Sequence, residues 1–167
     1  MALKHFQHSL FIKGRNDTGP LQPVYQQWYT DSCSMVIQPC YVLQSAGTPY
    51  EGEPRWMIFE AATDNSHSFV TETNFNKPPK EHNAWTRLIH AFIHYTYDLS
   101  GDQTLISNLD CDDHGKISNV TCYVRNSPPY HSRNNAEMAG IVECAFKLFA
   151  EQHVCNDICE LLGNVKM

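Results

Sequence analysis

Three side chains that bind metals well lie within seven residues near the end of the chain: His153, Cys155 and Cys159. If residues 157–162 form a helix, the two cysteines are four positions apart and project from one face, while His153 approaches the same point from the preceding bend. Imidazole and thiolate ligands favour Zn²⁺ over Ca²⁺ or Mg²⁺, which prefer oxygen. The segment therefore predicts a structural zinc site whose fourth ligand comes from elsewhere in the chain.

A second interpretation of this segment needs no metal. Free cysteines are among the commonest small buried residues, and a histidine beside them can be an ordinary core side chain. The neighbouring apolar residues Ile158, Leu161 and Leu162 would suit such a core. Spacing alone leaves both interpretations open.

The composition is that of one globular domain. The 167 residues are 42% hydrophobic and 18% charged, which is enough to bury a core without disulfides. A formal net charge of -6 argues against a protein that binds nucleic acid or a membrane surface. The seven thinly spread cysteines fit free thiols plus a metal pair better than a secreted scaffold. No stretch resembles a leader or a membrane span, so an intracellular, cytoplasmic protein is expected.

Two segments show the periodicity of amphipathic helices. The first begins at Trp85 and is expected to end near His94 and Tyr95. The second covers residues 135–152, with Asn134 as its N-cap, and leads directly into the metal-binding segment. The residues expected to be buried are Trp85, Leu88, Ile89 and Phe92 in the first helix and Ile141, Ala145, Leu148 and Phe149 in the second.

The predicted strands lie in the first two thirds of the chain, which makes the fold α+β with a helical C-terminus. Pro39 interrupts one apolar run and splits its strand. A hairpin is expected around Gly101 and Asp102, followed by a long polar loop over residues 110–135. Residues 1–32 give a weaker signal, for a hairpin or a loose arm. The expected strands are 35–43, 56–59, 68–75, 95–99, 103–109 and 120–124.

Two stretches together resemble the alpha-kinases, the atypical protein kinase family of the elongation factor 2 kinase, the myosin heavy chain kinases and the channel-fused kinases. They are Ala91-Phe92-Ile93-His94-Tyr95-Thr96-Tyr97 and His153-x-Cys155-Asn156-x-Ile158-Cys159-x-x-Leu162-Gly163. In that family, a histidine in an Ala-Phe-x-His-aromatic motif joins a His-x-Cys-x-x-x-Cys motif to hold a structural zinc. The resemblance therefore implies His94 as the fourth ligand.

The resemblance covers roughly residues 55–163. It implies an α+β, alpha-kinase-like C-terminal lobe with zinc-anchored helices. Residues 1–54 are then expected to be a reduced or remnant N-terminal lobe, in which neither a glycine-containing phosphate loop nor a strand lysine can be placed. Glu60, at the end of Trp56-Met57-Ile58-Phe59-Glu60, matches the family's adenine-contacting hinge.

The catalytic positions implied by the resemblance depart from the family pattern. Where the family has Asp-Leu-Gln-Gly, this chain has Asn108-Leu109-Asp110-Cys111, and the catalytic Asp of Leu-Thr-Asp-Pro falls on Asn119. An amide replaces a carboxylate poorly, because phosphoryl transfer relies on anionic oxygens that hold Mg²⁺. Asp110 keeps the same strand face, about 6.6 Å further along. With Asp112, Asp113 and His114 it forms either a residual Mg²⁺ site or a solvated loop.

The family activity implied by the resemblance is ATP-dependent phosphorylation of Ser or Thr. The amide substitutions favour a degenerate pseudokinase, which would act as a zinc-stabilised binding or regulatory module for a protein partner. One alternative is a kinase with residual activity that uses Asp110 for the metal. The other is a zinc-stabilised interaction protein unrelated to kinases. Zn²⁺ is the expected structural ion, binding of ATP and Mg²⁺ is left open, and neither nucleic acid nor membrane is expected as a partner.

Overall fold

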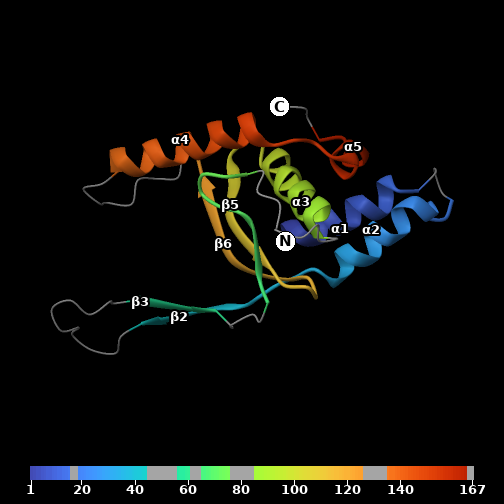
Figure 1. The fold of residues 1–167 in the computed structure, drawn as a ribbon, viewed down its shortest axis with the longest axis horizontal. Coiled ribbons are helices and arrows are strands. Elements are labelled where there is room, and N and C mark those ends of the chain that lie inside the picture. The colour runs from blue at the N-terminus through green and yellow to red at the C-terminus, as the bar shows by residue number, and fades with distance from the viewer. Residues whose placement is uncertain (16–18, 45–55, 61–64, 76–84, 126–134, 165–167) are drawn as a thin grey trace.

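The computed structural model describes residues 1–15, 19–44, 56–60, 65–75, 85–125 and 135–164, and only the backbone of residues 42–44, 56–59 and 135–138. Helices and strands both contribute to this part of the chain, as the predicted α+β class requires (Figure 1). In chain order the elements are α1 (Ala2–Lys13), α2 (Pro23–Ser34), β1 (Val36–Ile37), β2 (Cys40–Gln44), β3 (Trp56–Glu60), β4 (His67–Val70), α3 (Trp85–Leu99), β5 (Thr104–Cys111), β6 (Lys116–Val124), α4 (Asn135–Gln152) and α5 (Asp157–Leu162).

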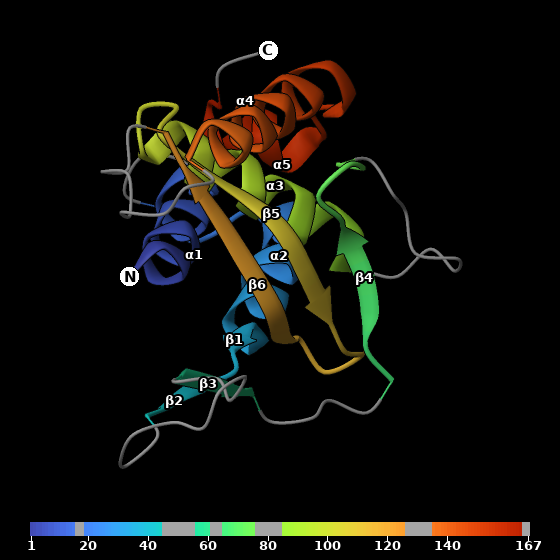
Figure 2. The same cartoon turned by 90° about the vertical axis from the view of Figure 1, so that its left-hand side faces the viewer.

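The main sheet has four strands in the order β1-β6-β5-β4. Strand β5 is antiparallel to both of its neighbours, and the short β1 runs parallel to β6. Strands β2 and β3 form a separate antiparallel pair that projects from the lower end of the molecule in Figures 1 and 2. The predicted interruption at Pro39 is confirmed, since the chain passes from one sheet to the other there. Proline has no N–H to continue the ladder.

Helices α1, α2 and α3 lie behind the main sheet in Figure 2, which looks onto the opposite face of β4, β5 and β6. Alternate residues of β5 are almost completely buried toward the helices: Leu105, Ser107, Leu109 and Cys111. They meet the apolar face of α3, as the period-two pattern of a half-covered strand requires. None of the described helices is long and apolar enough to cross a membrane.

Helix α3 is longer than predicted. Residues 95–99 were expected to form the first strand of a hairpin, and that prediction is wrong because they form the last turn of the helix. The aromatic and β-branched residues of this stretch favour strands, but packing against the core overrides that preference. Thr96 is buried, and its hydroxyl donates to the Phe92 carbonyl at 2.8 Å. The turn at Gly101 and Asp102 is present, with φ of 62° and 61°, and joins α3 to β5.

The hairpin or loose arm expected for residues 1–32 is also wrong, because two helices occupy this region. Phe6 and Leu10 are buried on one face of α1, and the Phe6 ring packs edge-on against Phe92 at 5.4 Å between ring centroids. Pro23 begins α2, where its missing N–H costs no hydrogen bond. Both helices thus pack onto the same core as α3.

The connection after β5 is a tight turn, and the long loop predicted over residues 110–135 is wrong in this part. Strand β6 spans nine residues and begins at Lys116. The buried Asp112 carboxylate accepts the N–H groups of His114 and Lys116 at 2.9 and 2.8 Å, which closes the turn. The strand predicted over 68–75 is shorter, ending at Val70, and residues 126–134, including the predicted cap Asn134, lie outside the described residues.

Helix α4 has the predicted bounds. Ala145 and Phe149 are buried as expected, and Leu148 is partly buried. Ile141 is 40% exposed, so its predicted burial is wrong, and Phe146 is buried instead. Phe146 is buried because the Arg125 guanidinium covers its ring and the Tyr97 ring packs beside it.

Candidate functional site

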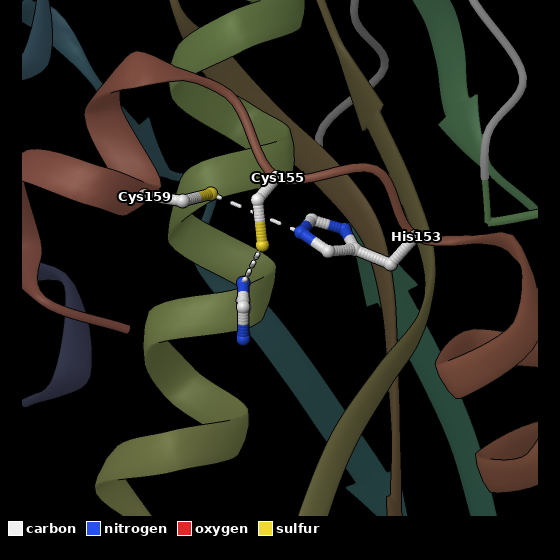
Figure 3. A group of neighbouring side chains, drawn as sticks. His153, Cys155 and Cys159 are labelled. Atoms are coloured by element: carbon white, nitrogen blue, oxygen red, sulfur yellow. Dashed lines mark hydrogen bonds between the residues drawn. The ribbon is translucent and has the colours of Figure 1, made fainter. Parts of the chain in front are cut away.

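Four side chains that can bind a metal meet where α3, the end of α4 and α5 come together: His94, His153, Cys155 and Cys159. One ligand atom from each lies within 4.8 Å of all the others. Cys155 Sγ is 3.6 Å from His94 Nδ1, and Cys159 Sγ is 3.8 Å from His153 Nε2. Figure 3 shows Cys155, Cys159 and His153 directed toward one point. The structure therefore brings together the residues that the two motifs named.

The donor set and its spacing fit a tetrahedral zinc ion. Zinc–sulfur and zinc–nitrogen bonds of about 2.3 and 2.1 Å place sulfur and nitrogen ligands of one tetrahedron about 3.6 Å apart. The two sulfur–nitrogen distances, 3.6 and 3.8 Å, match this spacing. The same two pairs can form thiol–imidazole hydrogen bonds when no ion is bound, as the dashed lines in Figure 3 indicate.

Burial favours the neutral forms of two of these side chains, His153 and Cys159. Burial, together with the nearby His94 and His90 imidazoles, lowers the pKa of His153 to about 3. Burial also raises the pKa of the Cys159 thiol to about 11, against the opposing effect of the Asn156 hydrogen bond. A zinc ion binds thiolate and neutral imidazole, so its charge would stabilise the Cys159 thiolate that burial alone disfavours.

Local structure explains how α5 presents its cysteine. Asn156 caps the helix, since its Oδ1 accepts the N–H groups of Ile158 and Cys159 at 3.0 and 3.2 Å. Its Nδ2 donates to the Arg87 carbonyl of α3 at 2.9 Å, and Gly163 ends the helix in the left-handed conformation. Asn156 is absent from the predicted site, although an asparagine directly before a helix is the residue type that favours this role.

An aromatic wall closes the site on the side of α4. The Phe149 ring lies 5.1 Å from the His153 ring and 6.2 Å from the His94 ring, and the two imidazole rings are 4.5 Å apart. His94 and Phe149 are buried. The surroundings therefore restrict water and favour a structural centre rather than a reactive one.

The positions predicted from the sequence to correspond to catalytic residues lie elsewhere, near the face of β5 turned away from α3, here called the outer face. Asn108 and Asp110 alternate with buried residues along β5, which places them on this outer face. The strand register shifts on both sides of Asn108. Asn119, on β6, has a φ of 52°, a left-handed conformation that is uncommon for a residue within a strand.

Asn119 is hydrogen-bonded to two of the other predicted residues, Asp110 and Glu60. Its Nδ2 donates to Asp110 Oδ2 at 3.1 Å, and its backbone N–H donates to Glu60 Oε2 at 3.0 Å. The structure thus brings Glu60, Asp110 and Asn119 together at the end of β3.

The remaining acids of the predicted cluster have other roles. Asp112 is 4% exposed and holds the β5–β6 turn, so the solvated-loop interpretation is wrong for this residue. Asp113 is exposed and lies 3.5 Å from His67 Nε2. In the sheet, Asp110 stands between Ser118 of β6 and Ser68 of β4.

The model of the Alpha-kinase family matches residues 24–159. Among solved structures, the apoenzyme alpha-kinase domain of myosin-II heavy chain kinase A is similar, with a TM-score of 0.58 and 13% identity over 99% of this chain and 55% of that one. The C-terminally truncated alpha-kinase domain of myosin heavy chain kinase gives 0.54 and 16% over 97% and 60%. The AMP-PNP complex of the first domain gives 0.58 and 13% over 97% and 53%. Comparison with curated proteins gave no significant match.

These matches exclude one of the three interpretations made from the sequence. The alternative of an interaction protein unrelated to kinases is wrong, because the family model covers most of the chain. The solved structures support the same α+β fold, and this chain spans between about half and three fifths of their length. The chain belongs to the alpha-kinase family.

Proposed function

We propose that this chain is a degenerate alpha-kinase domain that acts as a binding or regulatory module for a protein partner rather than as a phosphotransferase. The observation that carries the proposal is the chemistry of the outer face. Asn108 and Asn119 stand at the family's acidic positions, and the nearby carboxylate, Asp110, accepts a hydrogen bond from the Asn119 amide. The carboxylates of Asp110 and Glu60 remain at this face, and each already accepts a hydrogen bond from Asn119. With amides at the two predicted acidic positions, the face should bind Mg²⁺ weakly, because the ion prefers anionic oxygen ligands.

We further propose that a zinc ion stabilises the module. His94, His153, Cys155 and Cys159 would hold it, and four protein ligands leave no position for a reactive water. The ion would have a structural role, in which it connects α3 to α5. The division into a remnant lobe over residues 1–54 and a kinase-like lobe over residues 55–163 stays a prediction.

A second candidate function is a kinase with residual activity. It is favoured by Asp110, which retains a carboxylate on the same strand face as Asn108. Solved relatives include alpha-kinase domains in complexes with AMP, with AMP-PNP and, for an inactive variant, with ATP. By this likeness, nucleotide binding without transfer is the intermediate case between the two candidates.

Phosphate incorporation separates the candidates. The full chain is incubated with labelled ATP, Mg²⁺ and a generic basic protein substrate, alongside Asp110→Ala and the control Asp113→Ala, which removes an exposed acid from the neighbouring turn. The degenerate domain should give only background labelling in all three. Incorporation that Asp110→Ala abolishes and Asp113→Ala preserves would overturn the proposal and establish the second candidate.

Thermal unfolding with nucleotide tests binding independently of transfer. A ligand that binds only the native state stabilises it by about 2.7 kcal/mol at a hundredfold excess over its dissociation constant. A rise in Tm with ATP that does not depend on Mg²⁺, together with background labelling, would identify a nucleotide-binding pseudokinase. No rise would indicate a module that has lost the nucleotide as well.

Metal analysis tests the zinc. The purified chain should contain one equivalent, and Cys155→Ser or His94→Ala should lower both the metal content and the stability. Cys144→Ser is the matched control, since this cysteine is exposed on α4 away from the four ligands. A metal-free wild-type chain, with stability unchanged in the two ligand variants, would refute the site.

A further inference from the structure

His94 lies between a thiol and a carboxylate. Its Nδ1 faces Cys155 Sγ at 3.6 Å, and its Nε2 lies 3.6 Å from Asp98 Oδ1. Asp98 is one turn further along α3, so both side chains project from the same helix face. One ring nitrogen therefore points to the candidate metal centre and the other to the carboxylate.

Both side chains of the His94–Asp98 pair are largely removed from water. The His94 side chain is completely buried, and that of Asp98 is 19% exposed. Asp98 is the single acidic residue of α3, a helix that otherwise buries mainly apolar and aromatic side chains. A carboxylate removed from most of its water is stabilised by hydrogen-bond donors, and the Nε2–H of His94 is one that α3 itself supplies.

A neutral imidazole carries one proton, and the nitrogen without it is the one that can bind a metal. A carboxylate beside Nε2 holds the proton there and leaves the Nδ1 lone pair free. Partners of this kind orient metal-binding histidines, fix their tautomer and raise their basicity, and their loss typically costs tenfold to a hundredfold in metal affinity.

We propose that Asp98 is a positioning residue for the metal centre: its carboxylate, 3.6 Å from Nε2, attracts the proton of His94 to that nitrogen and thereby directs Nδ1 to the ion. This inference rests on the zinc site proposed above and adds a residue to it that does not bind the ion. The carboxylate lies outside the ligand set and acts on the ion through His94.

Zinc affinity of the full chain, measured by competition with a chromophoric chelator at fixed pH, tests the proposal. Asp98→Ala should weaken zinc binding by about tenfold to a hundredfold. Asp98→Asn keeps an oxygen that can accept the Nε2–H but removes the charge, so its loss should be smaller. Glu151→Gln is the matched control: it removes one negative charge two residues before His153, from an exposed side chain that pairs with Lys147, and should change the affinity less than twofold.

The tautomer of His94 gives a second measurement that a purely structural role would not affect. Long-range proton–nitrogen correlation spectra of the zinc-loaded chain should show His94 protonated at Nε2 and metal-bound at Nδ1. Coordination through Nε2 would overturn the proposal, as would an Asp98→Ala affinity within twofold of the wild type. If Asp98→Ala does not fold, the affinity and tautomer of Asp98→Asn decide: an affinity equal to that of Glu151→Gln refutes the role of Asp98.

The two proposals fail in different ways. A wild-type chain that binds no zinc refutes the metal site and, with it, the role of Asp98. A wild-type chain that binds one zinc, with unchanged affinity in Asp98→Ala, refutes the role of Asp98 alone.

Discussion

Replacing Asn156 should loosen the segment that carries two of the four candidate ligands. Its side chain makes two kinds of hydrogen bond: Oδ1 caps α5, and Nδ2 donates to the Arg87 carbonyl on α3. Asn156→Ala removes both. Asn156→Asp keeps the acceptor for the cap but cannot donate to Arg87, so the pair of variants separates the two contributions.

The magnitudes follow from these contacts. Loss of an N-cap to alanine costs about 1 kcal/mol. Loss of a side-chain hydrogen bond to a backbone carbonyl costs about 1 kcal/mol more. Asn156→Ala should therefore lower the free energy of unfolding by about 2 kcal/mol and Asn156→Asp by about 1 kcal/mol. For a domain of this size, 2 kcal/mol corresponds to a decrease in Tm of about 4–8 °C.

Urea and thermal unfolding of the zinc-loaded chain measure both effects, with Gln26→Ala as a control at an exposed amide on α2. Zinc affinity should fall in Asn156→Ala, because Cys155 precedes the cap and Cys159 follows it. Asn156→Ala with the stability and zinc affinity of the control would refute the argument that this side chain docks α5 on α3. Equal losses in the alanine and aspartate variants would assign the whole effect to the Arg87 contact.

Three further predictions concern the outer face, the thiols and the core. Asn119→Asp adds another carboxylate to the group formed by Asp110 and Glu60, so Mn²⁺ should raise the Tm of the variant more than that of the wild type. Equal responses in a thermal-shift assay would contradict this. Alkylation of the native chain at pH 8, followed by mass spectrometry, should leave Cys111 unmodified, because this thiol is buried and burial raises its pKa to about 12. Modification of Cys111 at the rate of the exposed thiols would contradict this prediction. The cysteines expected to react fastest are the exposed Cys33, Cys40 and Cys144, whereas the raised pKa of the Cys122 thiol should slow its reaction. Phe149→Ala should lower the free energy of unfolding by about 3–5 kcal/mol, because the ring is buried against both candidate histidines. A loss below about 1 kcal/mol in denaturant unfolding would show that the cavity left by the ring is filled at little cost.

The part of the metal centre that lies within one segment could be predicted from spacing. His153, Cys155 and Cys159 are close because the bend and the single turn of helix between them leave few other arrangements. His94 is 61 residues from Cys155. No periodicity connects positions so far apart, so only the resemblance to the alpha-kinases identified His94 as their neighbour.

The elements that were predicted wrongly are those where long-range packing outweighs local preference. Tyr97 belongs to a residue type that favours strands, yet its ring packs on Phe149 from the last turn of α3. The buried face of α1 consists of two residues, Phe6 and Leu10, so its helical periodicity is weak in the sequence. Their burial depends on packing against α3. Asp112 belongs to a run of charges of a kind that usually faces water, but its carboxylate accepts two backbone N–H groups of a tight turn.

The separation of His94 from the tail cysteines bears on the denatured chain as well as the folded one. An ion bound at both places would close a ring of about sixty residues that contains β5, β6 and α4. Closing a ring of that length removes conformational entropy worth about 4 kcal/mol at 25 °C in the chain-entropy model, as a disulfide would. In a reducing compartment, where disulfides do not persist, such a cross-link would give a small lobe the restraint that secreted domains obtain from oxidised cysteines.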